Sequence, residues 1–200
     1  ERLGFKVIEI NNGQRYELNK GFYLTIYAAD NCDPKLCYKF TACADLSAKD
    51  GSQQIDTISI VDNGKNTLMN VNDCPYELAK STFPDIKKNF DHIDVLLHGY
   101  GGAGPYPQCF DNLNSDQKLI AAQKKKDQFL IQALNYLKDI KPSYHLPFAG
   151  TYTLTGKLSK LQNLRGIPYM NDVHTYFKNH FNDKQFEGIK TIKLNPDDTF

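Results

Sequence analysis

Histidine, cysteine and aspartate are the side chains of this sequence that could bind a metal ion or move a proton. The five histidines are His92, His98, His145, His174 and His180. No two of them have the His-x-His or His-x-x-x-His spacing that brings two imidazoles to one metal ion. The sequence therefore encodes no local histidine cluster. His98, which ends an apolar run, is more often a core residue than a ligand at such a position.

The cysteines point to a reducing environment. They are Cys32, Cys37, Cys43, Cys74 and Cys109. An odd number favours free thiols, so we expect a cytoplasmic location. The first three could hold zinc, but their spacing is not of the Cys-x-x-Cys type and no fourth ligand lies nearby. Packing inside the protein is the simpler role.

The residues from Asp94 to Pro107 combine an apolar run with a glycine- and proline-rich loop. The apolar run fits a buried strand, and the glycines allow a ligand or another backbone to come close. A shaped loop on a stiff strand is a common ligand site, although a tight connection without a ligand is the alternative. The loop lacks the Gly-x-Gly-x-x-Gly spacing and the lysine of a phosphate loop. A Rossmann-type site would also need a βαβ unit around residue 100 and a parallel sheet.

Asp73 stands between a predicted strand and a predicted helix. It could cap the helix, with Pro75 in the first turn, or it could bind a metal ion. From the residues alone, the cap is favoured. There is no Gly-x-Ser-x-Gly elbow that would place a nucleophilic serine.

Hydrophobic periodicity predicts one α/β unit that begins with an antiparallel meander. Strands are expected at 6–10, 15–18, 22–28, 56–61, 66–71 and 188–194, in the apolar run that opens residues 94–107, and in a strand-like run within 141–152 that ends at a small-residue loop. Helices are expected at 76–90, 115–138, 158–164 and 171–182. Residues 29–52 are interpreted as a long loop, with a short strand at 37–41. Lys124, Lys125 and Lys126 are expected to form a solvated turn of the long helix.

Bulk composition excludes some classes of function. The chain has 200 residues, 40% of them hydrophobic and 24% charged, with a net charge of +1. This length suits one domain with a real core. The charge gives no reason to expect a nucleic acid or an anionic membrane as partner. No apolar run approaches the ~20 residues that span a bilayer.

Three stretches taken together resemble one family. They are 66–75 (NTLMNVNDCP), 94–110 (DVLLHGYGGAGPYPQCF) and 147–156 (PFAGTYTLTG). They are similar to the latter half of metallo-β-lactamase-fold proteins, in the bacterial branch near CMP-N-acetylneuraminate hydroxylase. The resemblance implies an αββα sandwich with a largely antiparallel or mixed sheet. It also implies that residues 1–200 are a single α/β domain, the C-terminal portion of a larger protein.

The resemblance also implies a metal site, zinc or iron, at one edge of the sandwich. Asp73 matches the family's bridging aspartate. Phe148 stands where the last metal histidine would be, and phenylalanine cannot coordinate a metal. Either the full protein binds one metal ion, or His98 or His145 substitutes, or the site has lost its metal. The family's first motif, His-x-His-x-Asp-His, is absent and should precede residue 1.

The function expected from the resemblance is that of a metal-dependent hydrolase or a hydroxylase-like enzyme. Its substrate would be a polar small molecule such as a sugar or a phosphate-bearing compound. Tyr100, Gly101, Gly102, Tyr106 and Phe148 would line the pocket. This chain alone should be inactive without a missing N-terminal half or a second copy in a homo-oligomer. In the hydroxylase branch, a Rieske domain outside this chain would supply electrons. A metal-free relative that binds a ligand or partner is the alternative.

Overall fold

The computed structural model describes residues 4–29, 56–195 and 197–199. Several expectations lie outside these residues: most of the long loop, the strand at 37–41, and the zinc alternative at Cys32, Cys37 and Cys43. Cys74 and Cys109 are described, and both are free thiols.

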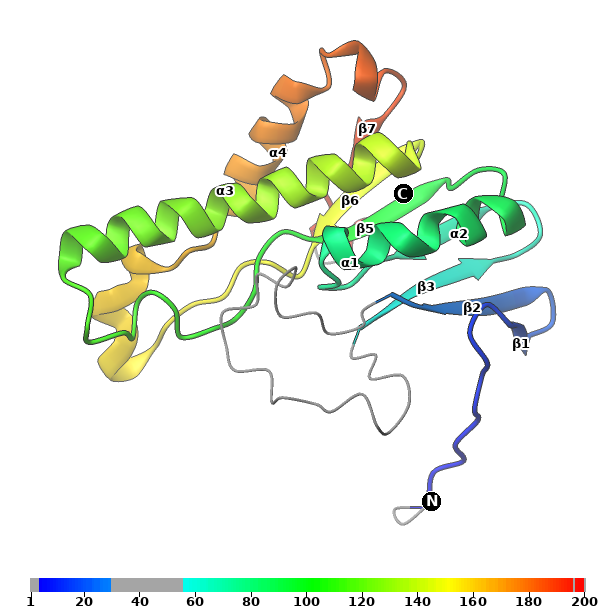
Figure 1. The fold of residues 1–200 in the computed structure, drawn as a ribbon, viewed down its shortest axis with the longest axis horizontal. Coiled ribbons are helices and arrows are strands. Elements are labelled where there is room, and N and C mark those ends of the chain that lie inside the picture. Colours follow the sequence, from blue (N-terminus) through cyan, green and yellow to red (C-terminus); the bar gives the residue numbers. More distant parts are fainter. Residues whose placement is uncertain (1–3, 30–55, 196, 200) are drawn as a thin grey trace.

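The strands form one mixed sheet whose order in space follows the order of the chain (Figure 1). Neighbours from β1 to β4 are antiparallel, and neighbours from β4 to β7 are parallel. The bounds are β1 Arg15–Asn19, β2 Phe22–Ala28, β3 Thr57–Asp62, β4 Thr67–Asn70, β5 Val95–Gly99, β6 Tyr144–Phe148 and β7 Lys190–Thr191. The expected mixed α/β class is confirmed.

Helices make the crossovers between the parallel strands. They are α1 Tyr76–Ala79, η2 Lys80–Thr82, α2 Phe83–Asn89, α3 Ser115–Ile140, η3 Gly156–Leu164, α4 Met170–His180 and η4 Lys184–Phe186. Parallel crossovers are almost always right-handed. Because the strand order advances in one direction without reversing, right-handed crossovers all put their helices on the same face of the sheet. No helix of the described part is long and apolar enough to cross a membrane.

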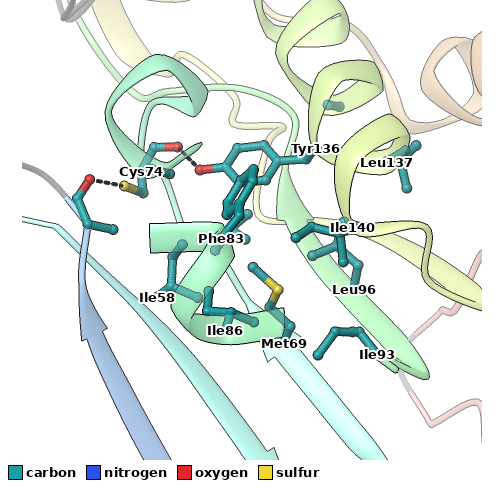
Figure 2. Close-up of a cluster of buried hydrophobic side chains, with 14 of the residues drawn as sticks. Ile58, Met69, Cys74, Phe83, Ile86, Ile93, Leu96, Tyr136, Leu137 and Ile140 are labelled. Atoms are coloured by element: carbon teal, nitrogen blue, oxygen red, sulfur yellow. Dashed lines mark hydrogen bonds between the residues drawn. The ribbon is translucent and has the colours of Figure 1, made fainter. Parts of the chain in front are cut away.

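The face under the helices holds the hydrophobic core (Figure 2). Ile58, Met69 and Leu96 point from three strands toward Phe83 of α2 and Tyr136 of α3, and all five side chains are at most 4% exposed. The core also fixes the chain after β4, because the Tyr136 hydroxyl donates to the carbonyl of residue 74 at 2.9 Å. Buried residues of all four α-helices belong to this one cluster.

The opposite face of the sheet is also apolar, but no α-helix of the described part packs on it. One row of directly paired, half-buried residues runs across five strands: Leu24, Val61, Leu68, Val95 and Tyr144. Part of this row, together with Phe22, lines a shallow hollow of about 380 Å³. We call this surface the bare face.

The structure corrects three expectations about local elements. Residues 6–10 form no strand, and Val7 and Ile8 are 65% and 44% exposed because no neighbouring strand pairs with them. Asp73 is not a helix cap, since α1 begins after Pro75. The helix expected at 76–90 is interrupted by a 3-10 turn. There the Ser81 and Thr82 hydroxyls donate to carbonyls three residues back, at 2.9 and 2.8 Å.

A βαβ unit is present around residue 100, because β5, α3 and β6 form one. The Rossmann interpretation nevertheless fails on two other points. The strand order has no reversal that would open a binding crevice. In addition, α3 begins at its own capping box on Asn114 and Gln117, well after the glycines, so no glycine-loop amides lead into the helix.

Candidate functional site

The loops after three parallel strands meet at one edge of the sheet. Because β4, β5 and β6 run in the same direction, their carboxyl ends lie side by side. The Gly99 amide donates to the Asn72 carbonyl at 3.4 Å, which joins the first two loops. The Tyr100 and Thr151 hydroxyls lie 3.0 Å apart, which joins the second and third. This carboxyl edge is where α/β sheets commonly carry their sites.

Asp73 is exposed in the first of these loops. It follows Asn72, whose φ of 50° belongs to the left-handed region that asparagine tolerates better than most residues. The Asn72 amide donates to the Asn70 side chain at 2.9 Å, which stabilises this turn. The geometry therefore places a carboxylate at the rim of the carboxyl edge.

The glycines of the second loop are required by packing between the loops. A Cβ on Gly101 would lie 2.7 Å from the Gly150 carbonyl oxygen and 2.9 Å from Ile167. A Cβ on Gly150 would lie 2.3 Å from the Tyr100 ring. Tyr100 is 3% exposed, so its ring is part of this contact. The loops after β5 and β6 thus close on each other.

Lys125 of α3 holds the next part of the glycine loop. Its ammonium group donates to the Tyr106 carbonyl at 2.9 Å and to the Gly102 carbonyl at 3.4 Å. The side chain is buried, and this desolvation lowers the pKa of Lys125 below its usual value. The expectation of a solvated lysine turn is therefore wrong at its central residue. The Tyr106 ring packs edge-on against Phe110, with centroids 5.1 Å apart.

A second buried polar group completes the wall of this region. The Gln108 amide nitrogen donates to the Gly104 carbonyl at 2.7 Å and to the Tyr152 hydroxyl at 3.0 Å. Burial raises the pKa of the Tyr152 phenol, more than its hydrogen bond to Gln108 and the nearby Arg165 lower it. Arg165 is only 3% exposed, and its guanidinium carbon lies 5.4 Å from the centre of the Tyr152 ring.

His98 and His145 lie in the core under the helices. Their rings have centroids 6.5 Å apart, and they pack against Tyr136 and Phe177 respectively. Burial lowers the pKa of His98 to about 3. Burial, helped by His98, lowers the pKa of His145 well below its usual value. Both rings are therefore neutral at pH 7.

The structure brings together only some of the residues expected to form the site. Tyr100, Gly101, Gly102 and Tyr106 gather at the carboxyl edge through the loop contacts. Phe148 ends β6 opposite Gly99. His145 and Pro147 of the same strand face the helices, and side chains alternate along a strand, so the Phe148 side chain lies on the bare face. Within residues 4–29, 56–195 and 197–199, no three His, Cys, Asp or Glu side chains are arranged to hold a metal ion.

Lys125, Gln108, Tyr152 and Arg165 were missed as site residues. For Lys125 a signal was present, because it falls in register with the buried residues Ala122 and Phe129 of α3. At these helical intervals it belongs to the apolar stripe. Nothing local marks Arg165 or Gln108, because their burial depends on loops distant in the sequence.

Comparisons with known proteins point to a fold. No family model matches the chain. A putative Rieske 2Fe-2S iron-sulfur protein of Mycobacterium tuberculosis, Rv3818, is 30% identical over 96 residues, which make up 48% of this chain and 17% of that protein. The structure of CmlA, a diiron β-hydroxylase from Streptomyces venezuelae, matches 96% of this chain and 34% of its own, with a TM-score of 0.53 and 14% identity.

YhfI, a metallo-β-lactamase fold protein from Bacillus subtilis, has a TM-score of 0.44 and 13% identity, over 96% of this chain and 56% of its own. The chain thus spans less than two thirds of the length of each of these three proteins. At 14% identity, the similarity to CmlA shows the fold and not the activity. The chain has part of the metallo-β-lactamase fold, as the three resembling stretches of its sequence indicate.

Proposed function

We propose that this chain forms the substrate-binding side of a metallo-β-lactamase-fold enzyme, a hydrolase or a hydroxylase-like protein that acts on a polar small molecule. The convergence of three loops at the carboxyl edge carries the proposal. Asp73, the Tyr100–Thr151 hydroxyl pair and the glycine loop lie in the loops that follow three parallel neighbouring strands, and a ligand at this edge could contact all three.

The described residues do not fit a complete zinc or iron site. Asp73 has the donor atoms and the exposure of a ligand, and its role as a metal ligand stays part of the proposal. His98 and His145 face the helices in the core, where their rings pack on Tyr136 of α3 and Phe177 of α4, 5.1 and 4.6 Å between centroids. Any metal ion would therefore need most of its ligands from outside residues 4–29, 56–195 and 197–199. We derive no catalytic step through a metal ion.

The bare face supports the proposal that a second sheet is needed. An isolated soluble protein rarely leaves a wide apolar surface open, and two sheets that pack face to face bury such surfaces. The apolar row from Leu24 to Tyr144 is suited to this packing. The partner we propose is the other half of the same sandwich; a second copy of this chain is the competing occupant.

A metal-free protein that binds a ligand is a second candidate. The residue that favours it is Phe148, which stands where the resemblance implies the last metal histidine and which cannot coordinate a metal ion. In this case the carboxyl edge would bind the same class of small molecule without chemical conversion.

Metal analysis of the protein expressed from its complete reading frame separates the two candidates. The enzyme predicts about one equivalent or more of zinc or iron, lost or weakened when Asp73 is changed to Ala. The matched control is Asp85→Ala, an exposed carboxylate in the first turn of α2. Absence of bound metal under all loading conditions would reject the enzyme and leave the metal-free protein.

A further inference from the structure

Two buried cations lie behind the glycine loop. Lys125 and Arg165 are 7% and 3% exposed. The ion pairs of the described residues involve other side chains, namely Arg15 with Asp62 and Lys80 with Glu77. Burying a charge costs free energy unless an opposite charge or strong hydrogen bonds compensate for it. Neither cation has a carboxylate of the described residues within ion-pair distance, so their positive charges are left uncompensated.

The two cations belong to one local cluster. A Cβ on Gly166, the residue after Arg165, would lie 2.5 Å from Cδ of Lys125, so the lysine stem packs directly on this backbone. The ammonium group of Lys125 has only neutral carbonyl partners, on Gly102 and Tyr106. These carbonyls accept hydrogen bonds from the ammonium group but do not neutralise its positive charge.

The guanidinium of Arg165 has an unused donor. Its Nε donates to the Gln162 carbonyl at 2.9 Å, and its guanidinium carbon lies 5.4 and 5.3 Å from the ring centres of Tyr152 and Tyr169. Its Nη1 is buried and has no hydrogen-bond partner. A buried donor left unpaired costs about 1–3 kcal/mol in general.

An unused acceptor lies in the same region. Gln108 is 2% exposed, and its Oε1 has no partner, while its Nε2 contacts Tyr152. Tyr152 therefore contacts Gln108, which has an unpaired acceptor, and lies near Arg165, which has an unpaired donor. Tyr169, whose ring centre is 5.3 Å from the Arg165 guanidinium carbon, is 50% exposed. This ring is the part of the region that faces solvent.

We propose that Arg165 and Lys125 form a binding site for an oxyanion, the phosphate or carboxylate group of a small molecule, which enters past Tyr169. A planar guanidinium with a free N–H binds such groups in strong, charge-assisted hydrogen bonds. Phosphate suits the site better than carboxylate. It accepts from Nη1, and near neutral pH it keeps a proton part of the time, which it can donate to Oε1 of Gln108.

The site adjoins the carboxyl edge. The Thr151 hydroxyl donates to the Pro168 carbonyl at 3.2 Å, and Ile167 packs against Gly101. The segment after Arg165 is therefore joined to the loops that follow β5 and β6. The biological meaning of the anion, as the charged group of the substrate, rests on the function proposed above. The binding itself does not.

Thermal unfolding with inorganic phosphate as the probe tests this site. The chain is unfolded in a chelator-containing buffer with increasing phosphate, with acetate, and with chloride at the same ionic strength. Binding to the folded state raises the melting temperature with the logarithm of the anion concentration. We expect phosphate to stabilise the wild-type chain above the chloride control. We expect Arg165→Gln to weaken phosphate binding about tenfold to hundredfold.

Two variants make the test specific. Lys160→Gln removes an exposed cation from the same 3-10 segment and should leave phosphate binding unchanged. Arg165→Lys keeps the positive charge but lacks the planar set of guanidinium N–H donors, so it should bind phosphate more weakly than the wild type. This variant keeps the test valid even if Arg165→Gln fails to fold. An equal effect of acetate would support a carboxylate as the natural group.

Equal melting curves in phosphate and chloride would overturn the proposal, and so would equal phosphate effects in the wild type and both Arg165 variants. Because metal is excluded from these experiments, a protein that binds phosphate but never binds metal would reject the proposed enzyme alone. A protein that binds metal but not phosphate would reject the anion site alone.

Discussion

Leu96 and Leu97 are neighbours in β5, and they lie in opposite surroundings. Leu96 is fully buried between the sheet and the helices, whereas Leu97 is half-buried on the bare face. Side chains alternate across a strand, so this pair compares the two faces with residue type and strand held constant. The helical face is a packed core, whereas the bare face is an apolar surface on which no α-helix of the described part packs. A sequence that is apolar on both faces of a strand does not show which face its own helices will cover.

The largest expected effect separates the two leucines. Leu96→Ala leaves a cavity under α3 and should cost about 3 kcal/mol of unfolding free energy. Leu97→Ala removes a side chain that remains partly in water and should cost less than about 1 kcal/mol. Urea unfolding of the two variants measures the difference. Equal losses would mean that the bare face is covered in solution as closely as the helical face.

Acid should destabilise the helical face through its two histidines. The pKa of His98 falls from 6.5 to about 3 on folding, and that of His145 falls as well, so below pH 6.5 the unfolded chain binds protons that the folded chain does not. The stability they contribute is complete above pH 6.5 and is lost as the pH falls toward 3. His98 should contribute a slope of about 1.4 kcal/mol per pH unit in this window, and His145 should add to it in the same direction.

His98→Phe tests this slope while keeping a ring against Tyr136. Urea unfolding between pH 4 and 6 should lose the contribution of one histidine in this variant. The control is His92→Gln, because His92 is exposed and bonds the Ser143 hydroxyl at 2.8 Å. If His98→Phe keeps the wild-type slope, the core histidine is protonated in the folded protein and the helical face is wetter than the structure shows.

Much of this architecture was predictable from local patterns. The strand from 22 to 28 and the long helix were expected close to their observed bounds, because alternation and 3.6-residue periodicity report burial directly. Residues 6–10 show the same alternation and form no strand. The alternation indicates that residues 6–10 could form a strand. A strand also needs a neighbouring strand to pair with, and none of the described strands pairs with these residues.

The candidate site was less predictable, for a physical reason. The glycine loop was visible as a stretch, but its contact with Gly150 comes from the parallel alignment of β5 and β6. No sequence pattern around Arg165 indicates that its side chain is buried, because the burial results from the packing of Tyr152, Tyr169 and a loop around it in the folded chain. Spacing along the chain identifies local motifs, whereas this site is assembled from residues far apart in the sequence.

The helical layer can be loosened without touching either face. Asn114 and Gln117 cap α3 reciprocally, at 2.9 Å in both directions. Asn114→Ala removes the acceptor for a helix N-terminal amide and should cost about 1 kcal/mol of unfolding free energy. Asn112→Ala, an exposed position before the cap, is the control and should be neutral. A neutral Asn114→Ala would show that the packing of α3 on the sheet, and not its cap, fixes the start of the helix.

A modest effect on stability should come with a clear effect on association. Leu97→Glu combined with Leu146→Glu places two carboxylates side by side on the bare face, where these residues are directly paired. Both positions are half-buried, so the unfolding free energy should fall by less than in the core variant Leu96→Ala, even with the repulsion between the two carboxylates. If a second sheet packs on the bare face in the whole protein, this face is uncovered in the isolated chain. The wild-type chain should then self-associate or bind hydrophobic dyes through the bare face, and the double variant should do so less. Sedimentation velocity at several concentrations measures the association, with Lys87→Glu on the exposed side of α2 as the charge control.

A wild-type chain that stays monomeric and binds no dye would contradict the proposal that a second sheet covers the bare face. The half-exposed leucines of β5 and β6 would then be an ordinary solvent-facing surface, and the contrast between the two faces would be one of degree.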